Sequence, residues 1–387
     1  MTVLYILHQT ILMGGGTKSF KVMLKGLMQR GIRPVVAMPD HKGVCSEIEA
    51  MNIPVIVTLF RDSTYPWVHS FKDVLLFLPR IVLHRIINYI AVKKIAKSVS
   101  GLGIELVHTN VSVCSIGFRV SRKLDVPHIY HIREYADKDF GLYYIPTRNL
   151  YLRQLTTAKS YNICITKDIQ HYFHQDKSSF SRVIYNGIQN SIATRPQVTK
   201  KDFFLYAGRV VAAKGVLEML EAYSIYKSHA SNVYPIYIIG EQPDASYQKK
   251  VKDFIREHHL EDLVTLWGQR SDIQDFMQQS RAIIIPSHNE GFGRCMPEAM
   301  FNGCLAIGRD TGGTHEQLEN GVELTGEEIA LRFNDNMQLA QHLIDVSNHS
   351  TDYYLPMLER AFYTVNHFYS AESNVNNVYQ FYKHILA

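Results

Sequence analysis

The chain has 387 residues, which is too long for one hydrophobic core of ordinary size and predicts two domains. Its hydrophobic and charged fractions, 46% and 20%, are those of a globular protein and exclude a disordered or low-complexity chain. The net charge of +5 conceals an asymmetry, because residues 1–185 carry 24 Lys and Arg against 12 Asp and Glu. No recognition motif accompanies this basic surplus, so it does not predict nucleic-acid binding.

Cysteine usage and the N-terminus both bear on the compartment. The five cysteines have no metal-ligand spacing, which argues against a structural zinc or a disulfide framework and favours a reducing compartment; they are Cys45, Cys114, Cys164, Cys295 and Cys304. The first expected strand begins at residue 3 and leaves no room for a signal peptide. We therefore expect a cytoplasmic protein.

Apolar runs alternate with helical patterns along the whole chain. The first set of expected strands covers 3–8, 34–39, 55–60, 106–110, 128–133 and 161–166. The second set covers 203–209, 235–240, 264–268, 282–287 and 305–310. Strands that alternate with helices predict parallel sheets covered on both faces. A polar stretch, 189–201, separates the two sets and reads as a linker, and the tail from 352 onward is helical and rich in aromatic residues.

The first strand is followed by three consecutive glycines, Gly14, Gly15 and Gly16. Glycine lets a backbone approach a ligand closely, so this loop can approach a bound molecule. The spacing is not that of a dinucleotide fingerprint, G-x-G-x-x-G, which makes the glycine signal weak by itself.

Residues 68–100 form an apolar helical stretch that carries six Lys and Arg. Charges interrupt it too often for a membrane span, which needs about 20 apolar residues. Two interpretations remain open. The stretch is either an interfacial helix on anionic lipid or a helix that covers a sheet and turns a basic face to solvent.

The strand expected at 128–133 ends in a possible site of its own. His131 lies near the strand end, where a functional role competes with that of a buried, hydrogen-bonded core histidine. The following Asp137, Lys138 and Asp139 formally match a metal-binding D-x-D motif, but short acidic triplets arise often by chance. We expect no metal here.

Two segments of the second half place charged residues after strands. In 205–222 a strand ends in Gly208 and Arg209, and Lys214 precedes an amphipathic helix. In 282–303 an apolar strand runs into a loop with Glu290, and Glu298 falls in the early turns of the next helix. The carboxyl ends of parallel strands are where ligands bind in open α/β sheets. Taken alone, Glu290 also fits a solvated loop residue and Glu298 an acid favoured by the helix dipole.

These segments, in this order, resemble the GT4 family of retaining glycosyltransferases. The pair Glu290 and Glu298 is similar to the family's E-x7-E motif, 208–215 to its G-R-x-x-x-x-K-G segment, and 310–317 to its G-G-x-x-E segment. Residues 13–31 resemble its N-terminal glycine loop and first helix, and 185–188 its Asn-Gly motif before the linker.

The resemblance implies a GT-B fold, in which two Rossmann-like domains face each other across a cleft and a C-terminal helix returns to the first domain. Residues 1–188 would then bind the acceptor, 200–363 the nucleotide sugar, and 364–387 would form the returning helix. The implied reaction needs no metal or other cofactor, and the nucleotide sugar is a co-substrate.

Roles for individual residues also follow from the resemblance. Arg209 and Lys214 would grip the donor diphosphate, Glu290 would bind the donor sugar and Glu298 the ribose, while His131 would contact the sugar near the reacting centre. The remaining donor-binding positions would be Gly14, Gly15, Gly16, Gly208, Trp267, Gly268, Arg270, Gly291, Phe292 and Gly293. The residues near 264–270 would surround the base, without deciding between uridine and guanosine.

The sequence therefore predicts a glycosyltransferase that uses a nucleotide sugar, with UDP preferred, and a glycan or lipid-linked acceptor in cell-surface polysaccharide or glycolipid assembly. An anionic membrane surface is a further expected partner, through the basic first half. Two other classes stay open: a nucleotide-sugar epimerase of the same fold, and an inactive glycan-binding or membrane-scaffold protein. Arg294, which follows the G-F-G tripeptide, departs from the apolar residue common in the family.

Overall fold

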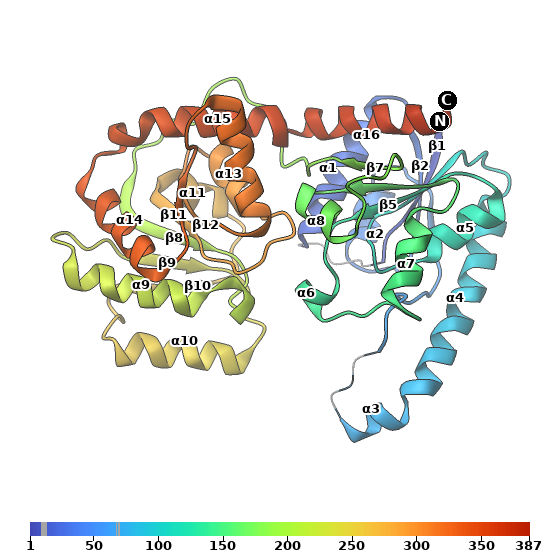
Figure 1. The fold of residues 1–387 in the computed structure, drawn as a ribbon, viewed down its shortest axis with the longest axis horizontal. Coiled ribbons are helices and arrows are strands. Elements are labelled where there is room, and N and C mark those ends of the chain that lie inside the picture. Colours follow the sequence, from blue (N-terminus) through green and yellow to red (C-terminus); the bar gives the residue numbers. More distant parts are fainter. Residues whose placement is uncertain (9–13, 67, 69) are drawn as a thin grey trace. The chain divides into compact units, whose positions relative to one another are not determined.

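The computed structural model describes residues 1–8, 14–66, 68 and 70–387. It divides into two compact units. The first domain consists of Met1–Gln189 together with Ala371–Ala387, and the second domain of Asn190–Ser370. Each is built around one parallel sheet, and the chain can be followed through both in Figure 1.

The first domain contains a seven-stranded parallel sheet of order β3-β2-β1-β4-β5-β6-β7. Its strands are β1 (Thr2–Ile6), β2 (Arg33–Met38), β3 (Val55–Val57), β4 (Leu106–Thr109), β5 (His128–Ile132), β6 (Ser160–Cys164) and β7 (Ser181–Val183). Its helices are α1 (Gly15–Gln29), α2 (Val44–Glu49), α3 (Phe71–Leu75), α4 (Phe77–Val99), α5 (Ile116–Leu124), α6 (Asp137–Phe140), α7 (Arg148–Leu155), α8 (Lys167–Tyr172) and α16 (Ala371–Leu386). Every residue of β1 and of β5 is buried, so both faces of the central sheet are covered.

The second domain repeats this plan with a six-stranded parallel sheet of order β10-β9-β8-β11-β12-β13. Its strands are β8 (Lys201–Ala207), β9 (Ile236–Ile239), β10 (Val264–Gly268), β11 (Ser280–Ile285), β12 (Leu305–Arg309) and β13 (Leu331–Phe333). Its helices are α9 (Val216–His229), α10 (Ala245–Glu257), α11 (Ile273–Gln279), α12 (Cys295–Phe301), α13 (Gly312–Thr325), α14 (Asn336–Asn348) and α15 (Leu355–Tyr369), with short 3-10 turns η1 (Ala212–Lys214) and η2 (Thr351–Tyr354).

The strand orders are those of doubly wound Rossmann-like sheets, and they confirm the predicted α/β class. All eleven strands expected from the sequence are present, with ends shifted by a few residues. Two further strands, β7 and β13, were not predicted. Each has three residues at a sheet edge, which is too short to produce a periodic pattern.

The C-terminal region contains two helices instead of the single one expected from 364 onward. α15 belongs to the second domain, and the chain leaves it at Ser370, which is extended. α16 then packs on α1, where Val375 fills the space beside Gly26: a Cβ on that glycine would lie 2.3 Å from a Val375 methyl carbon. Tyr382 of α16 reaches the core of the first domain and bonds to His108.

The apolar stretch at 68–100 is helical as expected, in two pieces, α3 and α4. The C-terminal half of α4 is buried through side chains such as Ala91, Ile95 and Val99, while much of its N-terminal half is exposed. Within the described ranges, no helix combines the length and the apolar character needed to cross a membrane.

Candidate active site

Lys214 and Glu290 meet at the carboxyl edge of the second sheet. β8 and β11 are neighbours in that sheet, so the loops that follow them lie together. Lys214 comes at the end of η1, shortly after β8, and Glu290 lies in the loop after β11. The distance from Lys214 Nζ to Glu290 Oε1 is 2.5 Å, and both side chains are about four-fifths buried, with 21% and 17% exposed.

The backbone explains why these two loops can approach so closely. Gly215 has a positive φ of 67°, and a Cβ there would lie 2.2 Å from the carbonyl oxygen of Pro286. Only glycine fits this position. The amide of His288 also donates to the carbonyl of Ala213 at 3.1 Å. The segment with Lys214 and Gly215 therefore joins the loop after β8 to the loop after β11, which carries Glu290.

A second set of contacts holds the Glu290 loop from the side of α13. The amide of Gly313 donates to the carbonyl of Glu290 at 2.7 Å, and a Cβ on Gly312 would lie 2.8 Å from the same oxygen. Gln317 Nε2 donates to the carbonyl of Phe292 at 2.5 Å. The Gly-Gly segment at 310–317 thus shapes the loop that carries Glu290.

Arg209 and Glu298 lie in the same region with different partners. Arg209 is exposed, and within the described part of the chain its guanidinium makes no hydrogen bond or ion pair. Glu298, in α12, accepts from Arg294 at 3.0 Å. The residue that departs from the family pattern therefore orients the carboxylate expected to bind the ribose.

The glycines and Phe292 shape the backbone around this pair. Gly208 is tied to the end of β9, where its amide donates to Ile239 at 2.9 Å. Gly293 has a positive φ of 76°, and Gly291 stands before Phe292 in the same loop. The ring of Phe292 is buried against Tyr369, with centroids 5.7 Å apart, so this side chain anchors the loop.

The residues expected near the nucleotide base lie on the edge strand β10 or just after it. Trp267 is 43% exposed, and Gly268 has a positive φ of 67°. The guanidinium of Arg270 stacks over the Trp267 ring, 5.0 Å from its centroid, and bonds twice to Asp272 at 2.8 and 2.7 Å. A partly exposed indole with a guanidinium fixed over its ring offers aromatic and cationic surface to a nucleotide base.

In the first domain, His131 is fully buried and does not stand at the surface of a site. Its Nδ1 lies 3.1 Å from His108 Nε2 and 3.2 Å from an Arg133 nitrogen, and His108 Nδ1 contacts the hydroxyl of Tyr382 at 2.5 Å. Burial, assisted by the charge of Arg133, holds the pKa of His131 well below its usual value. The imidazole is therefore a neutral member of a core network.

Arg133, two residues beyond His131, is the polar residue that reaches the carboxyl edge of the first sheet. Its Nε donates to Asn110 Oδ1 at 3.0 Å and another nitrogen donates to Asn186. A Cβ on Gly16 would lie 3.7 Å from Arg133 Cδ, so the arginine stands beside the N-terminal turn of α1, which Gly14 caps and Gly15 begins. This role of Arg133 was hard to predict from the sequence, because its partners Asn110 and Asn186 are distant along the chain.

The acidic triplet at 137–139 is engaged locally. Both carboxylate oxygens of Asp137 accept from the Tyr172 hydroxyl, at 2.6 and 2.7 Å, and Asp139 accepts from the amide of Tyr135 at 2.8 Å. These bonds hold the loop after β5, and the two carboxylates have separate partners.

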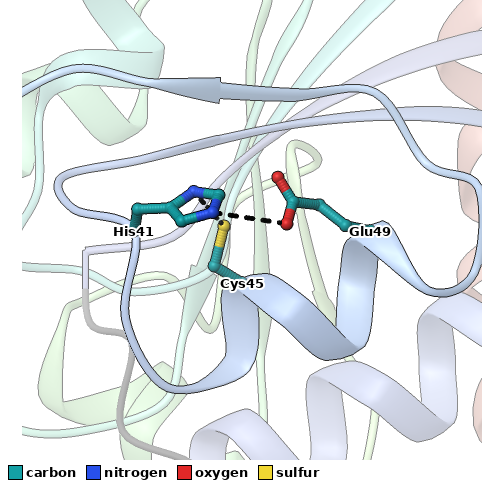
Figure 2. Close-up of side chains that lie close together, drawn as sticks. All are labelled: His41, Cys45 and Glu49. Atoms are coloured by element: carbon teal, nitrogen blue, oxygen red, sulfur yellow. Dashed lines mark hydrogen bonds and ion pairs between the residues drawn. The ribbon is translucent and has the colours of Figure 1, made fainter.

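Among the residues that the structure describes, a further group of side chains, in the first domain, has the composition of a metal site. Figure 2 shows His41, Cys45 and Glu49, which lie at the start of α2 and along it. His41 Nδ1 is 3.2 Å from Cys45 Sγ and His41 Nε2 is 3.5 Å from Glu49, and one ligand atom from each residue lies within 4.8 Å of the others. Burial and the charge of Glu49 raise the pKa of the thiol. Imidazole, thiolate and carboxylate are ligands that zinc accepts.

Comparison with known proteins agrees with this geometry. Residues 13–191 match the family model described as Glycosyltransferase Family 4, and residues 188–360 match Glycosyl transferases group 1. An uncharacterized glycosyltransferase of Methanocaldococcus jannaschii, MJ1178, is 25% identical over 76% of this chain and 83% of its own length. The lipopolysaccharide 1,2-N-acetylglucosaminetransferase of Salmonella typhimurium is 31% identical over 33% of this chain and 34% of its own.

Solved structures share the fold at lower identity. Anabaena Alr3699/HepE in complex with UDP and glucose has a TM-score of 0.74 at 17% identity, and covers 98% of this chain and 99% of its own. A mutant of S. aureus TarM was solved in complex with fondaparinux, alpha-GlcNAc-glycerol and UDP. It has a TM-score of 0.71 at 12% identity, and covers 100% of this chain and 99% of its own.

The sheet orders, the Lys214–Glu290 pair and the two matched models together define the class: this is a glycosyltransferase of GT-B type. The chain belongs to the GT4 family of glycosyltransferases.

Proposed function

We propose that the protein transfers a sugar from a UDP-sugar to a glycan or lipid-linked acceptor, with retention of configuration and without a metal, in the assembly of cell-surface polysaccharide or glycolipid. The observation that carries this proposal is the Lys214–Glu290 pair, which puts a cation and a carboxylate on adjoining loops at a carboxyl sheet edge. Arg209, exposed on the loop after β8, adds a second cation.

Departure of the diphosphate determines what the cations do. The bond between the anomeric carbon and the phosphate oxygen breaks, and negative charge grows on the diphosphate. Arg209 can bind that charge bidentately, and Lys214 can act as a point charge. Both sit on the protein before reaction, so they stabilise the transition state without reorganising solvent. Fixed cations of this kind take the place of a metal.

The acceptor hydroxyl attacks the anomeric carbon on the face from which the diphosphate leaves. The new bond joins that carbon to the acceptor oxygen, and the hydroxyl proton passes to the departing phosphate oxygen. Glu290 holds a hydroxyl of the donor sugar and does not attack. Glu298, oriented by Arg294, binds the ribose hydroxyls. His131 has a positioning role, since it contacts Arg133 from the core.

The choice of UDP and of a surface glycan rests on the relatives. The HepE and TarM structures contain UDP, and the Salmonella relative acts in lipopolysaccharide synthesis. A membrane-anchored acceptor also fits the basic surplus of the first half, so we place the protein in the cytoplasm, peripherally on the membrane.

Titration calorimetry with UDP and GDP, followed by a panel of UDP-sugars in a hydrolysis assay, tests the proposal. We expect UDP to bind more tightly than GDP and one UDP-sugar to release UDP and a sugar of unchanged anomeric configuration. Release of a sugar epimer without any acceptor would identify an epimerase. No binding of either nucleotide would overturn the assignment.

A further inference from the structure

The end of α3 and much of α4 expose a row of large apolar side chains to solvent. Six of them recur at helical spacing along one side, each 51–71% exposed, and we call them the α4 stripe: Leu75, Leu78, Val82, Ile86, Tyr89 and Ile90. Figure 1 shows α4 running beyond the sheet of the first domain, with α3 at its far end. An apolar surface of this extent marks a site of interaction.

The charges around the stripe indicate what it contacts. α3 and α4 carry six Lys and Arg, and their one acidic residue, Asp73, is ion-paired with Arg80 at 2.6 Å. Apolar side chains bordered by unbalanced positive charge are suited to an anionic bilayer. A second copy of the chain is a poor partner, because a two-fold contact through this face would bring like charges together.

An adjoining side of α4 borders a cavity of about 90 Å³ within the first domain, several times the volume a single water needs. Its walls are fixed by the segment that precedes α3. Asn88 holds the backbone of Arg61 through two hydrogen bonds of 2.8 and 3.0 Å, and Ser63 bonds to the Ser115 hydroxyl at 2.5 Å. The cavity is therefore preformed.

The cavity lining combines groups that suit hydroxyls with groups that suit an anion. Asp62 and Gln154 offer polar oxygens, and Tyr144 offers a ring that stacks on Tyr151 at 4.2 Å. Arg85 and Arg119 also line the cavity, and within the described residues neither guanidinium forms a hydrogen bond or an ion pair. A sugar that bears a phosphate satisfies both sets, because arginine binds phosphate oxygens bidentately.

Asp62, which lines the cavity, is compatible with such a ligand. Burial and the charge of Glu134 raise the pKa of Asp62 to about 7. A carboxyl group that takes up a proton near neutrality can donate a hydrogen bond and does not repel a phosphate.

We propose that this cavity receives the phosphate-bearing sugar head of a lipid-anchored acceptor, while the α4 stripe enters the anionic bilayer that carries it. The inference rests on the proposed transfer reaction and names its acceptor class. Arg85 lines the cavity and lies on α4 beside the stripe, so a single lipid-anchored molecule can reach both.

Vesicle flotation tests the stripe. We expect wild type to bind phosphatidylglycerol vesicles and not phosphatidylcholine vesicles, and the triple variant Leu78→Gln, Val82→Gln, Ile86→Gln to bind at least about tenfold more weakly. A matched control replaces three residues of the second domain that are as exposed, Met337→Gln, Tyr353→Gln and Tyr363→Gln. Equal binding by the triple variant overturns the proposal. So does a wild-type dimer that the triple variant converts to monomer without vesicles.

Ligand-observed NMR with glucose 1-phosphate tests the cavity, with UDP present in excess to fill the donor site. We expect the sugar phosphate to bind more tightly than glucose or inorganic phosphate, and Arg85→Ala or Arg119→Ala to weaken it about tenfold or more. Lys123→Ala, on the same helix as Arg119 but outside the cavity, should have no effect. Equal binding of inorganic phosphate, or unchanged binding by both arginine variants, overturns the cavity assignment.

The source of the head group is tested by turnover. Transfer to a polyprenyl-linked glucosyl phosphate in vesicles should exceed transfer to soluble glucose 1-phosphate, and the stripe variant should lose only the former. Equal rates overturn the lipid part. Calorimetry with UDP on the same variants separates this inference from the proposed function. A cavity variant that is inactive but still binds UDP like wild type has an intact donor site, so its defect lies in acceptor binding.

Discussion

The ammonium group of Lys214 lies 2.5 Å from the carboxylate of Glu290. The resemblance to the family assigns these residues to adjacent parts of the donor, the diphosphate and the sugar. Donor binding must therefore exchange this ion pair for two contacts to the substrate. Such an exchange limits the cost of desolvation, because each charge gains a contact to the substrate in place of the one it loses.

Replacing Glu290 by Gln should separate turnover from nucleotide affinity. The neutral side chain loses a charge-assisted bond to the donor sugar, so kcat should fall about tenfold or more. Affinity for free UDP should stay the same or rise, since Lys214 is released from its partner. Calorimetry with UDP and steady-state turnover measure the two effects. A large loss of UDP affinity with little change in kcat would mean that Glu290 binds the nucleotide instead.

Glu298→Gln should give the opposite pattern. Glu298 is held by Arg294 and assigned to the ribose, so its replacement should weaken UDP binding and kcat/KM together. Glu257→Gln, an exposed acid on α10, is the matched control. If UDP affinity is unaffected while kcat falls, the roles of Glu290 and Glu298 have to be exchanged.

Transfer should continue in excess EDTA, because Arg209 and Lys214 supply the positive charge. We expect zinc added to the EDTA-treated protein to bind at His41, Cys45 and Glu49, and Cys45→Ser to abolish that binding without changing the transfer rate. The opposite result would be that EDTA abolishes transfer, that manganese restores it, and that Asp139→Ala abolishes the restoration. That result would establish a metal at the acidic triplet.

Stability should depend on pH through Glu134. Burial raises its pKa from 4.5 to about 7, in spite of hydrogen bonds from Ser112. Between these values the folded protein keeps a proton that the unfolded chain has released, so stability falls as pH rises. Glu134→Gln removes the titrating group. The unfolding free energy of the variant minus that of wild type should therefore increase by at least about 1 kcal/mol from pH 5 to pH 8. Denaturant unfolding across that range measures it, and a constant difference would refute the shift.

Much of the fold followed from the sequence because the central strands are long and apolar. Residues 282–285 of β11, for example, form an uninterrupted buried apolar run before a polar loop, and the loop carries Glu290. The motif residues after β8 and β11 could likewise be placed, since parallel strands bring their carboxyl ends together. β7 and β13 gave no such signal in three residues each.

The first-domain site was harder to predict. β5 is buried on both faces, so alternation along it does not show that His131 turns into the core while Arg133 reaches the edge. The partners of Arg133, Asn110 and Asn186, are far away in sequence. The cavity beside α4 has the same character, because residues from 62 to 154 line it and no local pattern joins them.

Arg209 and Lys214 are the two cations assigned to the donor diphosphate. Arg209→Ala and Lys214→Ala each remove a charge-assisted contact worth roughly 1.5–3 kcal/mol, which corresponds to a loss of about 10- to 150-fold. The loss should be larger in kcat than in donor affinity, because charge on the diphosphate grows toward the transition state.

Lys214→Ala should also leave Glu290 unpaired and repelling the diphosphate, so the double variant Lys214→Ala, Glu290→Gln should bind UDP better than Lys214→Ala alone. Arg256→Ala and Lys249→Ala, both exposed on α10, are the matched controls for charge and residue type. If Arg209→Ala and Lys214→Ala leave binding and turnover within about twofold of wild type, below about half a kcal/mol, then these residues are surface cations and the diphosphate is bound elsewhere.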